Sequence, residues 1–411
     1  MSETPHSAHI HIDEERPLLG GLGRTLTVGS IGAGVLFLIG GAVLGLGGGW
    51  RAFWSAYLTG FVYCLTLSLG ALIFIIIQHV TRASWSIVVR RIAEFYANNM
   101  ILLLVLAIPL ITIGAPHLYP WINPDPSRHD FHLIEHKAVY LNQPFFIARI
   151  VLYFGIWITL ARYFLTRSLR QDSTGEPSTT VRMWTTAGPA VLIFALTSTF
   201  AAFDLLMSLT PSWYSTMFGV YFFAGSLLSI LALLGLTALF LQGRGHLVNI
   251  INNEHYHDIG KLLFAFVFFW GYIAFSQFML IWYANIPEET QWFLDRQQGN
   301  WLWLEVGLLF FHFFLPFLGL IGRWAKRRRP VLAFWCVWML IWHWIDIVYL
   351  ALPTFLPQGV SAMNLAAPLL MTLGMLGLWL GFAALSAQGK PIIPVRDPRL
   401  IESLEFDNIK V

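Results

Sequence analysis

Long apolar runs separated by short polar segments dominate the chain from residue 25 onward. The hydrocarbon core of a membrane is about 30 Å thick, and a helix needs about 20 apolar residues to cross it. Ten runs satisfy this length. We expect helices because an open strand edge in lipid would leave backbone groups without partners. The predicted spans are Thr25–Leu46, Ala52–Val80, Ile92–Ala115, Phe145–Leu165, Trp184–Leu206, Thr216–Leu241, Leu262–Trp282, Trp301–Ile321, Pro330–Leu352 and Ala366–Leu385.

The composition also predicts an all-α integral membrane protein. Of the 411 residues, 57% are hydrophobic and 11% are charged, whereas an average soluble chain has roughly 25% charged residues. This shortage excludes a soluble enzyme, a DNA-binding protein and a disordered scaffold. The net charge of +3 is too small to indicate a nucleic-acid partner. Two cysteines inside apolar runs, with no CxxCH motif, provide neither an iron–sulfur site nor a c-type haem attachment site.

The distribution of Lys and Arg predicts the orientation of the spans. Of the 25 basic residues, 20 lie in the segments on the side of the two termini. Four lie in the opposite loops and one, Arg149, lies inside the fourth span. Because Lys and Arg concentrate in cytoplasmic loops, both termini are predicted to be cytoplasmic. The first 24 residues are polar and are expected to remain uncleaved.

Matching positions suggest an internal duplication. Asp204 and Asp346 each precede a proline by seven residues, and Trp54 and Trp213 each precede a glycine by six. Spans two to five and six to nine are therefore predicted to be two related four-helix bundles, with two peripheral spans. The Pro-interrupted tail is expected either to dock along a partner subunit or to hang loose. The predicted segments are the cytoplasmic N-terminal segment 1–24, peripheral span one 25–51, first bundle 52–211, second bundle 212–353, peripheral span ten 354–388 and cytoplasmic tail 389–411.

Polar groups inside the spans are the candidate functional residues, because an ionisable group in hydrocarbon is costly unless it faces protein or water. Arg149 and Asp204 lie at similar depth and are expected to pair. His343 and Asp346 are three residues apart on one helix face, which suits a proton relay. The alternative is that such groups only fix the helix register. The proton-pathway candidates are Gln78, His79, Glu94, Asn98, Arg149, Asp204, Gln277, Glu305, His312, His343 and Asp346.

Three other interpretations remain open at this point. His312 and His343 lie at similar depth and would suit a b-type haem, although bulky aromatic neighbours leave little room for it. His129, His132 and His136 would share a helix face and bind zinc, unless they are ordinary surface residues. A secondary transporter would also combine repeated bundles with buried charges, but it requires helix breaks at matching places in both halves.

Three stretches resemble one known family. They are HKAVYLNQPFFIAR (residues 136–149), DLLMSLTPSWYSTMFGVYFFAG (204–225) and FWGYIAFSQFMLIWYANIPEE (269–289). These stretches resemble the NrfD-like, polysulfide-reductase-type membrane subunits, and within them the subunits of bacterial alternative complex III. The resemblance covers spans two to nine, and the chain is most similar to the shorter of that complex's two homologous membrane subunits.

The resemblance implies a subunit of a respiratory quinol:electron-acceptor oxidoreductase in the bacterial inner membrane. It implies that this chain has no redox centre of its own, anchors the complex and, as a further expectation, conducts protons. Arg149 and Asp204 in the first bundle, and Gln277, Glu305, His343 and Asp346 in the second, would then belong to proton half-channels. The implied partners are an iron–sulfur subunit, a multihaem cytochrome c subunit, the homologous NrfD-like subunit and lipids. Menaquinone or another quinol is the implied small-molecule ligand of the assembly.

Overall fold

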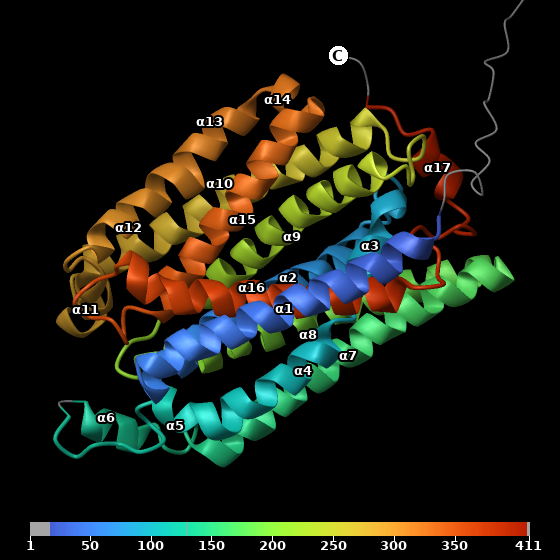
Figure 1. The fold of residues 1–411 in the computed structure, drawn as a ribbon. Coiled ribbons are helices and arrows are strands. Elements are labelled where there is room, and N and C mark those ends of the chain that lie inside the picture. Colours follow the sequence, from blue (N-terminus) through green and yellow to red (C-terminus); the bar gives the residue numbers. More distant parts are fainter. Residues whose placement is uncertain (1–16, 129, 409–411) are drawn as a thin grey trace, which may run out of the picture.

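The computed structural model describes residues 17–128 and 130–408, and every regular element in these ranges is a helix (Figure 1). Ten helical segments are long and apolar enough to cross a membrane, which confirms the predicted all-α membrane fold with ten spans. The first five are α1 (Gly20–Gly47), α2 (Trp50–Val80), Ile87–Leu118, α7 (Gln143–Thr174) and Pro177–Leu209. The last five are α9 (Phe218–Gly243), α10 (Asn253–Ala284), Trp301–Ile321, α15 (Arg329–Ala351) and α16 (Ala362–Ala387).

Three of these spans are divided into shorter helices. The third contains α3 (Ile87–Ala97), α4 (Met100–Pro109), the π-helical η2 (Leu110–Gly114) and α5 (Ala115–Leu118). The fifth contains α8 (Pro177–Leu205) and the 3₁₀-helical η3 (Met207–Leu209). The eighth contains α12 (Trp301–Gly307), the π-helical η4 (Leu308–Phe314) and α13 (Leu315–Ile321). The π-helical η2 lies in the second span of the predicted first bundle, whereas η4 lies in the third span of the predicted second bundle. They are therefore not the breaks at matching places that the transporter interpretation requires.

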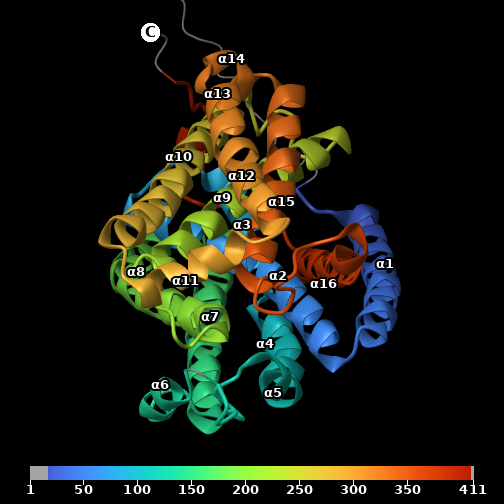
Figure 2. The same cartoon turned by 90° about the vertical axis from the view of Figure 1, so that its left-hand side faces the viewer.

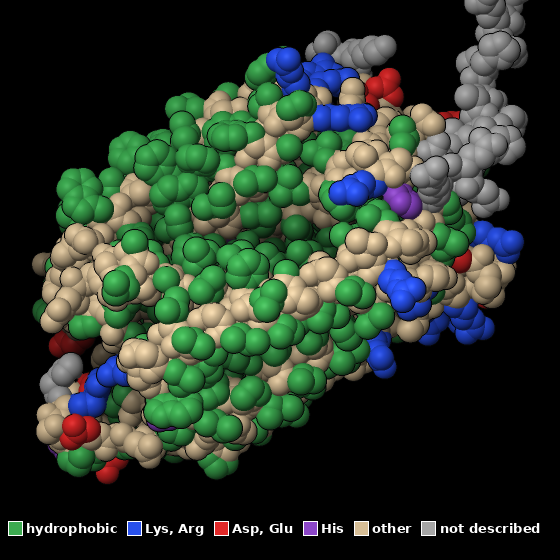
Figure 3. Space-filling view, viewed as in Figure 1, with side chains coloured by type: hydrophobic (Ala, Val, Ile, Leu, Met, Phe, Trp, Pro, Cys, Tyr) green, Lys and Arg blue, Asp and Glu red, His purple; other side chains and the backbone are tan. Residues whose placement is uncertain are grey.

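Four short helices lie at the two ends of the spans. The end with α14 (Arg323–Arg327) and α17 (Leu400–Leu404) is called here the tail end. The opposite end, with α6 (Phe131–His136) and α11 (Pro287–Arg296), is called the loop end (Figure 1). In the space-filling view, Lys and Arg side chains gather mainly at the tail end, and hydrophobic side chains cover the surface between the two ends (Figure 3).

The centre of the molecule is formed by α2 and α9, the first helices of the two predicted bundles. They run in the same direction, from the loop end to the tail end, as a parallel repeat requires. They approach closely at Gly70, where an added Cβ would lie 2.1 Å from the carbonyl oxygen of Ser226. Helices α3 and α8 pack against α2, while α10 and α15 pack against α9. The apolar part of α2 is 94% buried, so its side chains form the shared core of both halves.

The first and last spans form a peripheral pair on one flank of the molecule (Figure 2). Small residues let their backbones approach: a Cβ on Gly34 would lie 2.8 Å from the carbonyl oxygen of Gly374, and one on Gly377 would lie 2.6 Å from the Cα of Gly34. Close backbone approach at small residues is a usual way for helices to pack in lipid. Helix α16 packs in turn on α2, which attaches the pair to the core.

The third span begins earlier than the sequence predicted, at Ile87 rather than Ile92. The added turn contains Arg90 and Arg91, which are buried because they pair with carboxylates inside the protein. A hydropathy pattern excludes such residues from a span, since it cannot anticipate that their charges are paired.

The described part of the C-terminal tail packs against the chain's own tail end, so it does not hang loose. Asp397 accepts a hydrogen bond from Arg90 at 2.7 Å. Ser403 donates to the carbonyl oxygen of Trp85 at 2.9 Å. The buried Arg90 guanidinium requires a carboxylate partner, and the tail provides one.

Candidate functional site

The first buried carboxylate, Asp204 on α8, is fully paired. Its two oxygens accept from Arg149 Nη2 and Nε at 2.8 and 2.9 Å. Tyr153 donates a third hydrogen bond at 2.9 Å. The remaining Arg149 amino group donates to the carbonyl oxygen of Tyr140, whose ring lies 3.8 Å from the guanidinium carbon. The predicted pair is therefore present, and its bidentate geometry favours the interpretation that it fixes α7 against α8.

The second buried carboxylate, Asp346 on α15, is held by neutral donors. One of its oxygens accepts a short hydrogen bond from the hydroxyl of Tyr221 on α9. The other accepts from Trp270 Nε1 on α10 at 3.2 Å. The basic group within 4.0 Å, among the residues that the structure describes, is His343, whose Nδ1 lies at 4.0 Å from Oδ2. Asp346 is only 1% exposed. Because its hydrogen-bond donors are neutral, these contacts do not require the buried carboxylate to be charged.

His343 connects Asp346 to the central helix α2. Its Nε2 lies 2.9 Å from the hydroxyl oxygen of Thr66, and its ring lies 5.7 Å from that of Tyr63. Its Nδ1 has no hydrogen-bond partner in the described part of the chain. The predicted proximity of His343 and Asp346 is present, and one nitrogen of the imidazole remains available toward the carboxylate.

His312 contacts the Trp270 ring, at a centroid distance of 4.1 Å. It is fully buried, and neither of its ring nitrogens is hydrogen-bonded among residues 17–128 and 130–408. It belongs to η4, and π-helical turns occur frequently at functional sites because they change which side chains share a face.

The packing around the two histidines weighs against the haem interpretation. The Trp270 ring covers His312, and Thr66 occupies Nε2 of His343. A haem with two axial histidines requires space for a porphyrin between them. These aromatic and hydroxyl contacts leave none.

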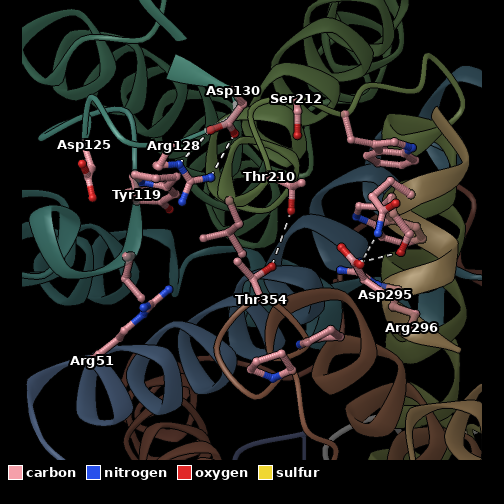
Figure 4. Close-up of a pocket in the computed structure, with 18 of the residues that line it drawn as sticks. Arg51, Tyr119, Asp125, Arg128, Asp130, Thr210, Ser212, Asp295, Arg296 and Thr354 are labelled. Atoms are coloured by element: carbon pink, nitrogen blue, oxygen red, sulfur yellow. Dashed lines mark hydrogen bonds and ion pairs between the residues drawn. The ribbon is translucent and has the colours of Figure 1, made fainter. Parts of the chain in front are cut away.

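A cleft of about 780 Å³ opens at the loop end, between the loops that join the spans (Figure 4). Three of the four loop-end basic residues line it, namely Arg51, Arg128 and Arg296. Arg128 is paired with Asp130 through two hydrogen bonds of 2.8 and 2.9 Å. The cleft is polar enough to hold water and reaches the loop-end tips of both bundles.

Arg296 forms the deepest charged group of this cleft and is only 2% exposed. It donates to the carbonyl oxygens of Trp292, Tyr349 and Leu350 at 3.1–3.2 Å. Tyr349 and Leu350 are the last turn of α15, the helix that carries Asp346, so Arg296 caps that helix at its negative end. Burial lowers the pKa of Arg296 to about 10, and interactions with Tyr349, Asp295 and Glu305 act in the opposite direction.

Glu305 lies near enough to Arg296 to interact with it electrostatically. It is half-buried, and its Oε2 has no partner in the described residues. Gln277 lies on α10 and accepts a hydrogen bond from Ser215 at 3.2 Å. Of these two candidates, Glu305 is the one that interacts with a residue of the loop-end cleft, Arg296.

The tail-end candidates separate into a paired network and an unpaired group. Glu94 lies 3.5 and 3.0 Å from the Nε atoms of Arg90 and Arg91, and Asn98 donates to Ser386 at 3.2 Å. His79, by contrast, is stacked on the ring of Phe164 at 5.1 Å. Its ring nitrogens and the Gln78 side-chain oxygen have no partner in the described residues. These two residues therefore carry buried polar atoms that the ion-pair network does not satisfy.

The zinc interpretation receives no support from the residues that can be described. His129 lies outside them, and His132 is an exposed residue of α6 that lies 3.8 Å from Glu135. No group of three His, Cys, Asp or Glu side chains within residues 17–128 and 130–408 is arranged to hold a metal ion.

Sequence reasoning missed four residues that contact Asp346, His343 or the end of their helix, namely Thr66, Tyr221, Trp270 and Arg296. Hydroxyl and indole groups are common in membrane helices, so none of the first three is unusual by itself. Arg296 was counted only as a loop charge. The predicted repeat was the available signal, because it assigns Tyr221 and Trp270 to the same four-helix bundle as Asp346.

Comparison of the chain with models of protein families and with curated proteins gave no match. The multi-pass membrane fold therefore rests on the ten apolar helices themselves.

Proposed function

We propose that this chain is a proton-conducting membrane subunit of a respiratory quinol:electron-acceptor oxidoreductase. The observation that carries the proton-conducting part is the contrast at two matching positions. Asp204 has a guanidinium partner, whereas the equally buried Asp346 has only neutral donors and a histidine at 4.0 Å. A buried carboxylate without a fixed counter-ion can take up and release a proton, and ionisable groups inside a membrane commonly serve proton relays.

The ligand set around Asp346 favours a proton over a metal cation. Hard cations such as Ca²⁺ and Mg²⁺ bind several oxygen ligands. Around Asp346, Tyr221 and Trp270 donate O–H and N–H groups to the carboxylate. These hydrogen atoms occupy the positions that a cation would need, so a proton suits the site best.

Access from the loop end supports the same proposal. Arg296 lines the cleft and binds the end of α15, one turn beyond Asp346. Glu305 lies near Arg296, half-buried. A proton would pass from water in the cleft, by way of this region, to Asp346 and then His343.

The respiratory part of the proposal rests on the resemblance of residues 136–149, 204–225 and 269–289 to NrfD-like subunits of alternative complex III. The chain would be the shorter of the two homologous membrane subunits and would anchor an iron–sulfur subunit and a multihaem cytochrome c. It would bind no redox cofactor itself, and a quinol such as menaquinone would be the substrate of the assembly. The tail end, which is rich in Lys and Arg, would face the bacterial cytoplasm.

The test uses the complete complex reconstituted in vesicles, with the ratio of protons to electrons as the measurement. Asp346→Asn keeps the side-chain size but cannot carry the transferred proton, so we expect electron transfer to continue with fewer protons moved. Glu135→Gln, an exposed change on α6, is the control and should leave the ratio unchanged. An unaltered ratio in Asp346→Asn would disprove the relay. Purification of the complex from the native membrane, without multihaem cytochrome or iron–sulfur chains, would disprove the respiratory assignment.

A further inference from the structure

A mostly apolar cavity of about 310 Å³ lies among the spans, near the tail end. Its walls come from four helices and include Leu26 on α1, Phe95 on α3, Phe240 on α9 and Ala384 on α16. Helix α1 packs on α16 and α2. The cavity therefore separates part of the peripheral pair, α1 and α16, from α3 and α9.

A second cavity, of about 570 Å³, adjoins the first and carries basic groups. Leu19 lines both cavities, and Arg244 and His246 line the second, just beyond the end of α9. The backbone N–H of His246 donates to the carbonyl oxygen of Leu241 at 3.0 Å, and Leu241 lines the apolar cavity. The basic segment is thus joined directly to a wall of the apolar cavity.

Arg244 is the cation that can meet an anion at this place. Its guanidinium carbon lies 5.2 Å from the centre of the Phe240 ring, which is part of the apolar wall. The Arg244 side chain is exposed, and no carboxylate pairs with it among residues 17–128 and 130–408. A planar guanidinium donates two parallel N–H bonds to a phosphate, so Arg244 suits a phosphate group at the mouth of the cavity.

The hydrogen bonds inside the apolar cavity favour a hydrocarbon chain over a quinone ring. Thr237 donates its single hydroxyl hydrogen to the carbonyl oxygen of Leu233 at 2.8 Å. Tyr96 must therefore be the donor in its 2.7 Å contact with Thr237. This pair has no hydrogen left for a quinone oxygen, and Ser30 on α1 is a further hydroxyl residue of the lining. The lining offers an occupant mainly hydrocarbon.

We propose that the two cavities together bind one anionic phospholipid, with its phosphate at Arg244 and an acyl chain between α1, α3, α9 and α16. Basic pockets between spans near the membrane surface bind anionic headgroups, and Lys and Arg side chains gather at this end of the molecule (Figure 3). The acyl chain fills the space between the peripheral pair and the core, so the lipid joins α1 to α9. The inference does not depend on the proposed proton relay.

The experiment measures lipid binding to the full-length protein in detergent by native mass spectrometry. It compares phosphatidylglycerol, which is anionic, with phosphatidylcholine of the same acyl chains, and we expect tighter binding of phosphatidylglycerol. Arg244→Gln should reduce this preference about fivefold, the factor that one basic residue near the membrane surface contributes. Arg170→Gln, a change at an exposed residue near the tail end of α7, is the matched control and should keep the wild-type preference.

A second pair of variants tests the acyl chain. Ala384→Leu extends a side chain into the apolar cavity without changing a charge. It should weaken the binding of both lipids several-fold, because the chain loses its space. Ala195→Leu, at an exposed position of α8, is the control and should bind both lipids as the wild type does. Glycerol phosphate, which has the charge of the headgroup without the chains, should not compete with phosphatidylglycerol.

Each part of the proposal has a result that would overturn it. An unchanged preference in Arg244→Gln would remove the phosphate site. Equal lipid binding in Ala384→Leu and Ala195→Leu would remove the acyl-chain site, and competition by glycerol phosphate would show an anion site that needs no lipid. A quinone that displaces phosphatidylglycerol from the wild type, but not from Ala384→Leu, would make the occupant a quinone. If Ala384→Leu does not fold, Leu236→Phe, which enlarges a side chain on the α9 wall, takes its place with the same expectations.

Discussion

Asp204 and Asp346 occupy matching places in the predicted repeat, near the loop ends of the last spans of its two bundles, yet their surroundings differ. Asp204 is bound in a bidentate pair by the Arg149 guanidinium. Asp346 is bound by the hydroxyl of Tyr221 and the indole N–H of Trp270, which stabilise it without supplying a charge. The same scaffold position thus becomes a structural ion pair in one half and a candidate proton site in the other.

The difference shows that burial alone does not identify a functional carboxylate in a membrane protein. Both residues are 1% exposed. A counter-ion on the neighbouring helix determines whether the carboxylate must remain charged. Substitutions that remove the contacts of Asp204 or of Asp346 test this comparison.

The largest loss of stability is expected when the Arg149–Asp204 ion pair is broken. Arg149→Ala leaves Asp204 buried without its counter-ion, and the loss of one partner of such a pair costs about 3–5 kcal/mol of stability. The measurement is the thermal unfolding of the purified protein, with Arg162→Ala, an exposed residue of the same helix, as the control. An equal unfolding temperature in both variants would show that the pair does not stabilise the fold.

A smaller loss of stability is expected at Asp346. Asp346→Asn retains an oxygen that can accept from Tyr221 or Trp270 and removes no ion pair, so we expect a cost of about 1–2 kcal/mol. Asp204→Asn, which separates Arg149 from its counter-ion, should cost clearly more in the same unfolding assay. Equal costs for the two substitutions would mean that Asp346 is held as an anion, contrary to the proposed role.

The contacts of Arg296 with the end of α15 predict a loss of stability of intermediate size. Arg296→Lys keeps the positive charge but cannot donate to three carbonyl oxygens at once. We expect a loss of about 1–2 kcal/mol, with faster hydrogen exchange at residues 346–352 than in wild type. Protection of these amides at the wild-type level would show that Arg296 does not position the end of α15.

The smallest effect is expected at the exposed end of the tail. Glu402→Gln removes the partner of Arg399, but the Glu402 side chain is 51% exposed, and exposed pairs contribute about 0–1 kcal/mol. Asp397→Asn, which removes the partner of the buried Arg90, should destabilise the protein more. Limited proteolysis of the tail measures both, and equal sensitivity would show that the Asp397 contact does not hold the tail.

The sequence predicted part of the candidate site. The Arg149–Asp204 pair followed from similar depth on adjacent spans, and the His343–Asp346 contact followed from their spacing on one helix. The π-helical turns of η4 around His312 were not predictable from a regular helical period.

The sequence by itself determined the ten helices and the gathering of basic residues at one end. Both follow from local chemistry, because a run of about 20 apolar residues is stable as a helix in hydrocarbon and charged segments remain in water. The tertiary structure decided which polar groups meet. Asp346 on α15 is joined to Tyr221, Trp270 and, through His343, to Thr66, which lie on three other helices. Uniformly apolar helices do not record in their sequences which face turns inward, so only packing could bring these residues together.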